Sequence, residues 1–315
     1  MSEIKKVATR AGFGTALVEL GAKRDDFVVL DADLAAATQT GMFKKAFPER
    51  FYDCGIAEQN MMGIAAGIAA TGKKVICSSF AMFAAGRAYE QVRNSVGYPH
   101  LNVIIGATHA GISVGEDGAT HQCCEDIALM RTIPGMTIIN PADETEAKLA
   151  VEAALEVDGP VYMRFGRLAV PVIFGDDYKF EIGKGVELKD GTDVTIIATG
   201  LMVDEAMQAY ELLKQEGISA RIINMHTIKP LDKEIVFKAA KETGAIVTAE
   251  EHSVIGGLGS AVSEVLAEEY PVPVVKLGVY DVFGHSGPAP KLLDEFGLRA
   301  VNIVEKAKKA IAMKK

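Results

Sequence analysis

The chain alternates short apolar runs with longer segments of helical spacing, and this rhythm limits the folds that it can adopt. Strands that are apolar throughout and separated by helices indicate a parallel sheet covered on both faces. Such a sheet binds ligands beyond the carboxyl ends of its strands. In the first half, the predicted strands are Phe27–Leu30, Lys74–Cys77, Leu101–Ile105, Met136–Ile139 and Val161–Met163, and the predicted helices are Ala8–Gly21, Glu58–Ala70, Ala84–Val96 and Glu144–Glu156.

The rhythm stops between residues 170 and 190, where Pro171, Gly175 and Gly183 interrupt it and no long helix fits. It then restarts. The sequence therefore predicts an α/β protein with two doubly wound domains, residues 1–172 and a smaller domain at 191–315, joined by a linker at 173–190. In the second domain, the predicted strands are 193–198, 220–223, 245–249 and 272–276, and the predicted helices are 203–216, 233–242, 260–269 and 301–312.

The composition excludes several classes of partner. Lys and Arg total 33 against 42 for Asp and Glu, which gives a formal net charge of −9. The chain therefore lacks the basic footprint of a nucleic-acid binder or of a protein that binds anionic membranes. Its 4 Cys do not form a disulfide framework in a chain this long, and residues 1–10 hold no apolar signal segment. We expect a reduced, cytoplasmic protein with no nucleic-acid or membrane partner.

The densest polar segment is residues 107–122, directly after the strand predicted at Leu101–Ile105. It contains His109, His121, Glu116, Asp117 and several glycines. Histidines and carboxylates in one glycine-rich loop can transfer protons and bind hydroxyl groups. A solvated surface loop is the alternative interpretation. A zinc site with the neighbouring cysteines is a weaker one, because the spacing matches no known zinc pattern.

Glu58 begins a helix whose following residues, 61–70, are apolar on every face. A helix that is apolar all round is buried in a core or an interface. Glu58 is then either a first-turn acid that complements the helix dipole, or a carboxylate in a dry site, where it would be a strong partner for a ring nitrogen. The pattern alone leaves both interpretations open.

Two further pairs lie where strands end. Phe80 and Phe83 follow the strand Lys74–Cys77, and core packing is the more common role of such a pair. Arg164 and Arg167 end the last strand of the first domain. Two arginines at the carboxyl edge of a sheet suit a phosphate or a carboxylate, or else surface ion pairs.

Together these segments resemble, in the same order and over nearly the whole chain, the C-terminal half of transketolase, which consists of a pyrimidine-binding domain and a C-terminal domain. Residues 115–122, Gly-Glu-Asp-Gly-Ala-Thr-His-Gln, are similar to the family's Gly-Glu-Asp-Gly-Pro-Thr-His-Gln. Thr108-His109 resembles its Thr-His-Asp, with Ala110 in place of Asp. Residues 55–58 resemble its Gly-x-x-Glu motif, and residues 32–34 its Ala-Asp-Leu.

The resemblance implies the fold and cofactor of the thiamine diphosphate enzymes. Glu58 would hydrogen-bond N1′ of the aminopyrimidine, and Phe80 and Phe83 would face that ring. Asp33 would lie near the thiazolium. One departure is that Ala84-Ala-Gly-Arg87 stands where the family has a third aromatic residue.

The resemblance also implies roles at the substrate end of the site. His109 and His121 would contact sugar hydroxyls and move protons, and Asp117 would bind a hydroxyl and select its stereochemistry. Arg167, with Arg164, would hold the phosphate of a sugar phosphate substrate.

The family's diphosphate-binding motif, Gly-Asp-Gly followed by Asn, supplies the magnesium ligands, and Gly-Asp-Gly does not occur in the 315 residues. We therefore expect no metal ligands here. A separate N-terminal transketolase subunit would carry the diphosphate-binding domain and most of the Mg²⁺ contacts. We expect this chain also to contact a second copy of itself, giving an α2β2 heterotetramer, and the lone chain to be folded but inactive.

The resemblance implies a transferase that moves a two-carbon ketol unit from a ketose phosphate to an aldose phosphate, as in the pentose phosphate pathway. The alternatives are a transketolase for an unusual sugar, a deoxyxylulose-phosphate synthase fragment and the β subunit of a 2-oxo acid dehydrogenase. The two histidines of the loop favour sugar substrates. A non-catalytic regulatory subunit is the alternative from another class.

Overall fold

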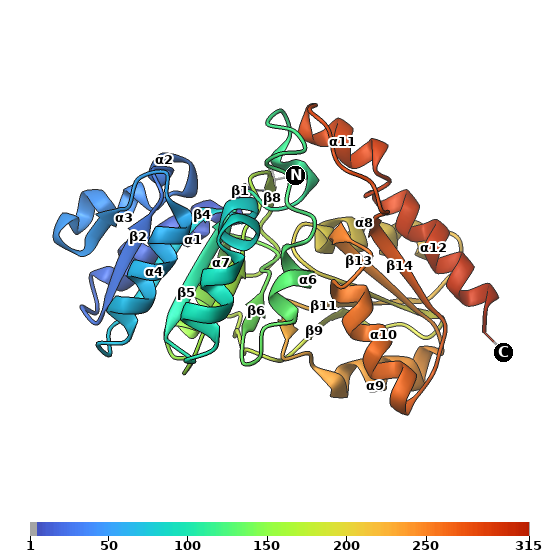
Figure 1. The fold of residues 1–315 in the computed structure, drawn as a ribbon. Coiled ribbons are helices and arrows are strands. Elements are labelled where there is room, and N and C mark those ends of the chain that lie inside the picture. The colour runs from blue at the N-terminus through green and yellow to red at the C-terminus, as the bar shows by residue number, and fades with distance from the viewer. Residues whose placement is uncertain (1–4, 315) are drawn as a thin grey trace.

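The computed structural model describes residues 5–314, which form two α/β domains side by side (Figure 1). The predicted fold class is confirmed, because most strands pair in parallel and helices cover both faces of each main sheet. Within residues 5–314, no helix is both long enough and apolar enough to cross a bilayer.

The first domain is built on a sheet of seven strands. All neighbours in it pair in parallel except β12, which runs antiparallel to β6. The central strands are buried throughout, as their unbroken apolar runs predict. In spatial order the strands are β12 (Thr227–Lys229), β6 (Thr137–Ile139), β7 (Val161–Arg164), β5 (Val103–Thr108), β4 (Lys74–Phe80), β2 (Phe27–Asp31) and β3 (Phe51–Asp53).

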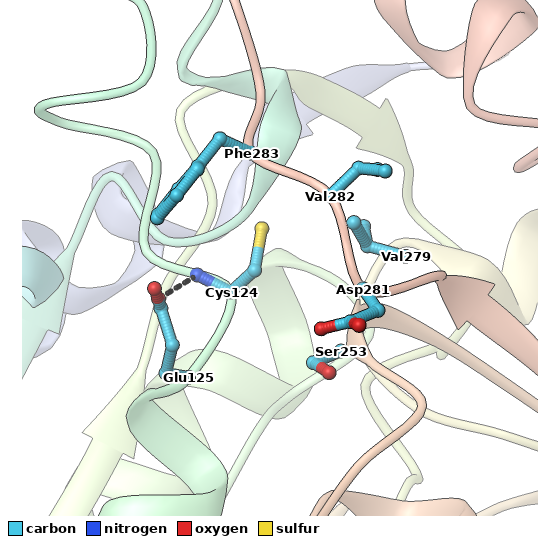
Figure 2. Close-up of a pocket in the computed structure, with 7 residues that line it drawn as sticks. All are labelled: Cys124, Glu125, Ser253, Val279, Asp281, Val282 and Phe283. Atoms are coloured by element: carbon cyan, nitrogen blue, oxygen red, sulfur yellow. Dashed lines mark hydrogen bonds between the residues drawn. The ribbon is translucent and has the colours of Figure 1, made fainter.

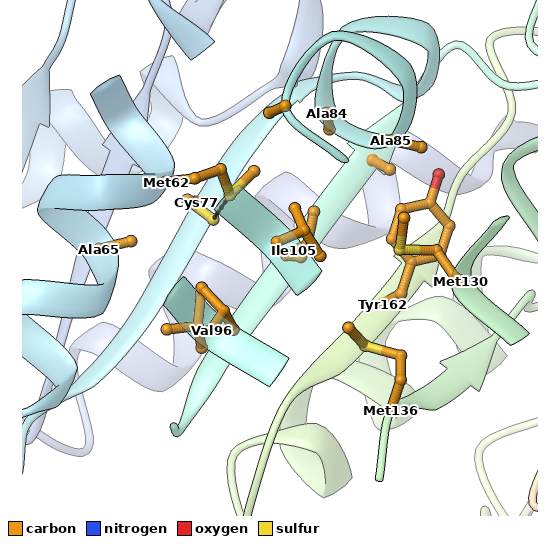
Figure 3. Packing of buried hydrophobic residues seen from close by; sticks show 14 of the residues in the cluster. Met62, Ala65, Cys77, Ala84, Ala85, Val96, Ile105, Met130, Met136 and Tyr162 are labelled. Atoms are coloured by element: carbon orange, nitrogen blue, oxygen red, sulfur yellow. Dashed lines mark hydrogen bonds between the residues drawn. The ribbon is translucent and has the colours of Figure 1, made fainter. Parts of the chain in front are cut away.

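Two hydrophobic clusters cover the two faces of this sheet. Gly12 lets one helix approach another closely, since a Cβ there would lie 2.8 Å from the carbonyl oxygen of Glu144. Figure 3 shows the cluster on the opposite face, where Met62 and Ala65 pack towards Cys77 and Ile105. One face carries α1 (Thr9–Gly21), α3 (Gly41–Ala46) and α7 (Glu144–Ala154), and the other carries α4 (Glu58–Ala69) and α6 (Asp126–Arg131); α2 (Ala35–Thr38) follows β2.

The segment predicted as one helix, Ala84–Val96, is not a regular α-helix. It consists of two wide π-type turns, η2 (Met82–Arg87) and η3 (Val92–Gly97), around the short α5 (Tyr89–Gln91). In the first turn, the N–H of Ala88 donates to the carbonyl of Phe83, five residues back. A π turn takes in an extra residue and is frequent at functional sites, and periodicity alone did not reveal it.

The second domain has a sheet of five strands with helices on both faces. Its core strands are parallel, and β9 is an antiparallel edge strand. In order the strands are β14 (Val274–Val279), β13 (Ile246–Ser253), β10 (Val194–Ala198), β11 (Ala220–Asn224) and β9 (Val186–Lys189), and the helices are α8 (Met202–Gln215), α9 (Lys233–Thr243), α10 (Leu258–Glu269), α11 (Ala289–Glu295) and α12 (Ala300–Ala312).

Three short pairings lie outside the predicted rhythm. β9 falls within the predicted linker. β12 lies inside the predicted second domain, after β11, but joins the sheet of the first domain. β8 (Ala169–Pro171) pairs with β1 (Lys6–Ala8) in a separate two-stranded sheet. Strands of three or four residues carry no readable periodicity, because their pairing depends on distant chain segments.

A buried ion pair lies where the two domains meet. The guanidinium of Arg164, at the end of β7, donates to the carboxylate of Asp126 at 2.9 Å, and both side chains are at most 4% exposed. The hydroxyl of Tyr162 donates to the same carboxylate. Arg164 also donates to the carbonyls of Cys123 and Glu251, and the second of these belongs to β13 of the other domain. One guanidinium therefore ties both domains together.

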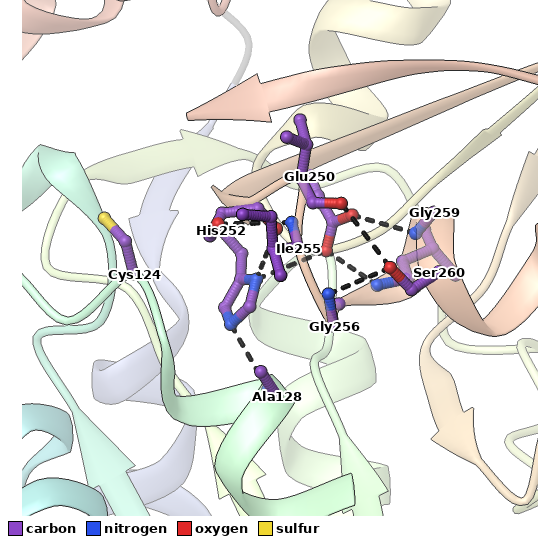
Figure 4. Close-up of polar contacts among 12 residues, drawn as sticks. Cys124, Ala128, Glu250, His252, Ile255, Gly256, Gly259 and Ser260 are labelled. Atoms are coloured by element: carbon purple, nitrogen blue, oxygen red, sulfur yellow. Dashed lines mark hydrogen bonds and ion pairs between the residues drawn. The ribbon is translucent and has the colours of Figure 1, made fainter. Parts of the chain in front are cut away.

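A neutral histidine completes this joint (Figure 4). Burial lowers the pKa of His252 to about 4. Its Nδ1 lies 2.8 Å from the carbonyl of Ser253, and its Nε2 accepts from the N–H of Ala128 in the first domain. The adjacent Glu250 accepts the N–H groups of Leu258 and Gly259 at the start of α10. These bonds satisfy most of the polar groups that the joint buries, and Oδ1 of Asp126 has no hydrogen bond within the described residues.

We predict that Arg164→Met lowers the free energy of unfolding by about 3–5 kcal/mol, because it leaves the Asp126 carboxylate buried without its counterion. Urea unfolding followed by circular dichroism measures the change. The control is Arg93→Met on the exposed surface, which should change stability by less than about 0.5 kcal/mol. An equally small loss at Arg164 would show that the joint does not depend on this pair.

Candidate active site

Four predicted site residues lie at the carboxyl edge of the first sheet. Phe80 ends β4 and pairs in register with Thr108, the last residue of β5. His109 is the next residue, so it lies beside Phe80 at the same end of the sheet. Asp33 follows β2, and Arg167 follows β7. Parallel strands bring residues that are far apart in sequence to one edge, as predicted for a ligand site.

Aromatic rings form a continuous row along this edge. The rings of Phe80 and His109 stack with centroids 3.8 Å apart, and those of Phe80 and Phe83 lie 5.8 Å apart and nearly parallel. His121 meets Phe83 edge-on at 5.2 Å. The structure thus brings together both predicted histidines and both predicted phenylalanines, although they come from three separate segments.

His109 is buried, and its environment disfavours its charged form. Burial, followed by the nearby cations Arg10 and Arg167, lowers its pKa to about 3. Its Nδ1 lies 3.0 Å from the hydroxyl oxygen of Thr108, and its Nε2 lies 3.5 Å from Nη1 of Arg10. Because a guanidinium is only a donor, Nε2 is the acceptor and Nδ1 carries the proton. Neutral His109 therefore offers Nε2 as a hydrogen-bond acceptor.

Arg10, on the first turn of α1, belongs to this site and was missed in the sequence analysis. Its pKa is lowered by burial and by the positive charge of Arg167. A cation in the first turn of a helix opposes the helix dipole, and this unfavourable placement is the signal that could have identified it. Two arginines that repel each other at an open edge have the charge that suits an anion.

Arg167 and Asp117 face each other at the rim of the site. The Arg167 guanidinium donates to the carbonyl of Val114 and lies 3.3 Å from Glu116 and 3.8 Å from Asp117. The side chains of Arg167 and Asp117 are 38% and 44% exposed. Both are thus accessible to a ligand, unlike the side chain of Arg164, which lies at the end of β7 but is buried against Asp126.

The second domain holds the loop that carries Asp117 and His121. The buried Gln122 side chain donates to the carbonyls of Ile112 and His285, the latter in the connection between β14 and α11. On the other side, the carboxylate of Glu251 accepts the N–H of Ser113 at 2.5 Å. The loop is therefore clamped from both sides.

Glu58 is buried at the start of α4, as one of the two sequence interpretations required. Its carboxylate accepts a hydrogen bond from Nη1 of Arg87 at 2.8 Å. The rest of α4 is predicted to be buried in a core or an interface, and in this single chain Gly63, Ile64 and Gly67 are exposed on one face of the helix. Its all-round apolar character therefore leaves an apolar face uncovered in this single chain.

Asp33 lies close to the turn that precedes Glu58. The N–H groups of Asp33 and Gly55 both donate to the carboxylate of Asp53 at 3.1 Å. Asp33 itself is exposed and adopts a positive φ of 62°. Its side chain has no hydrogen bond within the described residues, so it is free to meet a ligand.

A cavity of about 270 Å³ lies elsewhere, between the two domains (Figure 2). Its walls include Cys124 and Glu125 of the first domain and Phe283 of the second, and none of the predicted site residues. Burial raises the pKa of the Cys124 thiol, which makes it a weak nucleophile. We assign the site to the sheet edge, where the polar and aromatic groups converge.

Among residues 5–314, no group of three or more His, Cys, Asp or Glu side chains is arranged to hold a metal ion. His121, Cys123 and Cys124 therefore do not form the zinc site considered as an alternative.

Comparison with protein families gives two matches. Residues 5–172 match the family described as "Transketolase, pyrimidine binding domain". Residues 183–303 match the family described as "Transketolase, C-terminal domain".

Three known proteins are similar to this chain over almost their whole length. A protein of Methanocaldococcus jannaschii, provisionally named a transketolase C-terminal section, is 54% identical, with 94% of each chain covered. The 6-deoxy-6-sulfo-D-fructose transketolase subunit SqwH of Clostridium sp. is 46% identical, with 92% of this chain and 90% of that one covered. A solved structure described as a split gene transketolase, inactive beta4 tetramer, is 53% identical with a TM-score of 0.91, covering 99% of this chain and 100% of that one.

We predict that the ring of His109 stays neutral from pH 8 down to pH 5, because its pKa lies near 3 in the folded chain. Two-dimensional ¹H–¹⁵N spectra of the histidine side chains, assigned with His109→Gln, measure this directly. They should show a proton on Nδ1 throughout. Protonation near the ordinary value of about 6.5 would contradict the burial and charge arrangement at this edge.

Proposed function

The chain belongs to the transketolase family, as a C-terminal section related to split transketolases, and on that premise we propose that it is the subunit of a thiamine-diphosphate-dependent transketolase. In this proposal it transfers a two-carbon ketol unit from a ketose phosphate to an aldose phosphate. The observation that carries the proposal is an unbroken row of contacts along the sheet edge. It leads from a buried carboxylate through one guanidinium, two aromatic rings and a histidine to a second guanidinium: Glu58, Arg87, Phe83, Phe80, His109 and Arg10.

The residues at one end of this row fit the pyrimidine half of the cofactor. The buried carboxylate of Glu58 accepts a planar N–H donor, and that donor lies 4.4 Å from the centre of the Phe83 ring. An aminopyrimidine is also a planar, N–H-bearing group suited to stacking. When bound, thiamine diphosphate supplies the nucleophilic carbon and the electron sink for carbon–carbon cleavage. Glu58 would hold the ring and, being buried, would exclude competing water.

The histidines would move protons next to the cofactor. His109 offers the lone pair of Nε2, with Nδ1 fixed by Thr108, so it can accept a proton from a sugar hydroxyl and return it. His121, whose Nδ1 lies 2.9 Å from the hydroxyl of Thr120, stands across the Phe83 ring. Stacking on Phe80 fixes the plane of the His109 ring, which favours transfer along one direction.

The arginines would bind the anionic end of the sugar. Arg10 and Arg167 present two cations that a phosphate would neutralise, relieving their mutual repulsion. Asp117, opposite Arg167, would accept a hydrogen bond from a substrate hydroxyl. Each sugar would thus lie with its reacting end towards His109 and its charged end towards the rim.

A partner chain would supply the diphosphate-binding domain and the Mg²⁺ contacts. The exposed apolar face of α4, directly after Glu58, supports such a contact. The similar solved protein, described as a split gene transketolase in an inactive tetramer of β chains, supports self-association without activity. We propose an α2β2 assembly on this basis.

A second candidate is ketol transfer from a sulfonated sugar. The relative SqwH is named for 6-deoxy-6-sulfo-D-fructose. A sulfonate, like a phosphate, is tetrahedral and anionic, so paired arginines would bind either. Assays with fructose 6-phosphate and with 6-deoxy-6-sulfofructose as donors separate the two candidates.

We predict that Glu58→Ala abolishes ketol transfer in the complex reconstituted with the diphosphate-domain chain, Mg²⁺ and thiamine diphosphate. The lost contact lies in a dry site, where removal of one such group lowers turnover by about 100-fold or more. Circular dichroism checks that the fold survives, and Glu90→Ala, an exposed acid, is the matched control. The unmixed wild-type chain should be inactive. Turnover near the wild-type rate in Glu58→Ala would refute the assignment.

We predict that Arg167→Ala raises KM for phosphorylated sugars by about ten-fold or more and leaves kcat nearly unchanged. The reason is that the lost phosphate contact is equally strong in the substrate complex and in the transition state. Initial-rate kinetics with a phosphorylated donor and its unphosphorylated counterpart measure the effect. KM for the unphosphorylated sugar should stay close to the wild-type value. An equal loss for both sugars would mean that Arg167 only supports the loop through Val114.

A further inference from the structure

Arg87 occupies a position that the proposed function leaves unexplained. It ends the wide turn η2, and Nε2 of Gln59 donates to its carbonyl at 3.0 Å, which fixes its backbone beside α4. Its guanidinium donates to Glu58 at 2.8 Å and lies 4.4 Å from the centroid of the Phe83 ring. The side chain of Arg87 is 48% exposed and that of Glu58 only 2%.

These two contacts are the ones that the proposed function assigns to the cofactor's aminopyrimidine. The guanidinium, like that ring, is planar, lies against an aromatic face and donates N–H to the buried carboxylate. Both groups would therefore use the same side of Glu58 and the same ring of Phe83. They compete for one set of partners.

We propose that Arg87 is an internal competitor of the cofactor: its guanidinium holds the pyrimidine subsite in the empty chain and must leave Glu58 before the cofactor can bind there. This inference rests on the proposed cofactor. The pair benefits the empty chain, because a carboxylate as buried as Glu58 is costly without a partner.

The guanidinium has a route out of the subsite. Its half-exposed side chain makes no hydrogen bond other than that to Glu58 within residues 5–314. Leaving therefore breaks one ion pair and one ring contact, and water can solvate the released cation. When a binding-competent state is only partly populated, the apparent affinity falls by that fraction. Arg87 should thus set how tightly the chain binds the cofactor.

Titration calorimetry on the full chain, with Mg²⁺ present, tests this with thiamine diphosphate and with unphosphorylated thiamine. Arg87→Ala should bind both ligands about ten-fold more tightly than the wild type, because the competing group is gone. Arg93→Ala, an exposed arginine on the same segment, is the control and should bind like the wild type. In a Glu58→Gln background, Arg87→Ala should have little further effect, since the pair is already broken.

The two ligands separate competition at the pyrimidine from a general effect of charge. Equal tightening for both supports the proposal. Unchanged or weaker binding of both by Arg87→Ala overturns it, and so does weakening confined to thiamine diphosphate, which would make Arg87 a diphosphate contact. If neither ligand binds any variant, and the reconstituted complex does not bind them either, the proposed cofactor fails as well. Wild-type binding with no gain in Arg87→Ala refutes only the competition.

Discussion

The buried ion pair between Arg164 and Asp126 is the contact on which the arrangement of this chain depends. Taking two charges out of water is costly, and that cost is offset here by the ion pair and by the hydrogen bonds that Arg164 donates to two backbone carbonyls. One guanidinium fixes the end of β7, the start of α6 and the carbonyl of Glu251 in the second domain. The loop with His121 and Asp117 runs between the segments that Arg164 holds, so this ion pair helps to fix the position of the loop.

The second domain therefore influences the site indirectly, by holding the loop that carries two of its residues. Its Glu251 and the connection that contains His285 clamp the loop through backbone groups and through Gln122. A glycine-rich loop that bends freely would otherwise present its histidine and carboxylate in many positions. Such clamping reduces the conformational entropy that must be lost when a substrate is bound.

Opposite requirements meet at Glu58. A carboxylate that is to hold a ring nitrogen works best where water is excluded, but in an empty site it is then a buried charge. Arg87 resolves this conflict in the single chain, and it does so with an exposed, movable side chain. The neighbouring apolar face of α4 is also left uncovered in the single chain. Both features suit a subunit whose site is completed by another chain.

The sequence determined the elements and many of the site residues because these are local properties. Apolar runs and helical spacing predicted the core strands and most long helices. Residue type and position made the glycine loop, Glu58 and the two phenylalanines candidates, and the resemblance to transketolase assigned them to the site. The wide turn at Met82–Arg87 and the short strands β9 and β12 were not predicted, since hydrogen bonds and distant pairing decide them. Arg164 and Arg167 look equivalent in the sequence, three residues apart at one strand end. Only the tertiary structure decided that one is buried on Asp126 while the other lies at the exposed rim near the half-buried Arg10, because the partner of a charge is set by segments that meet in space.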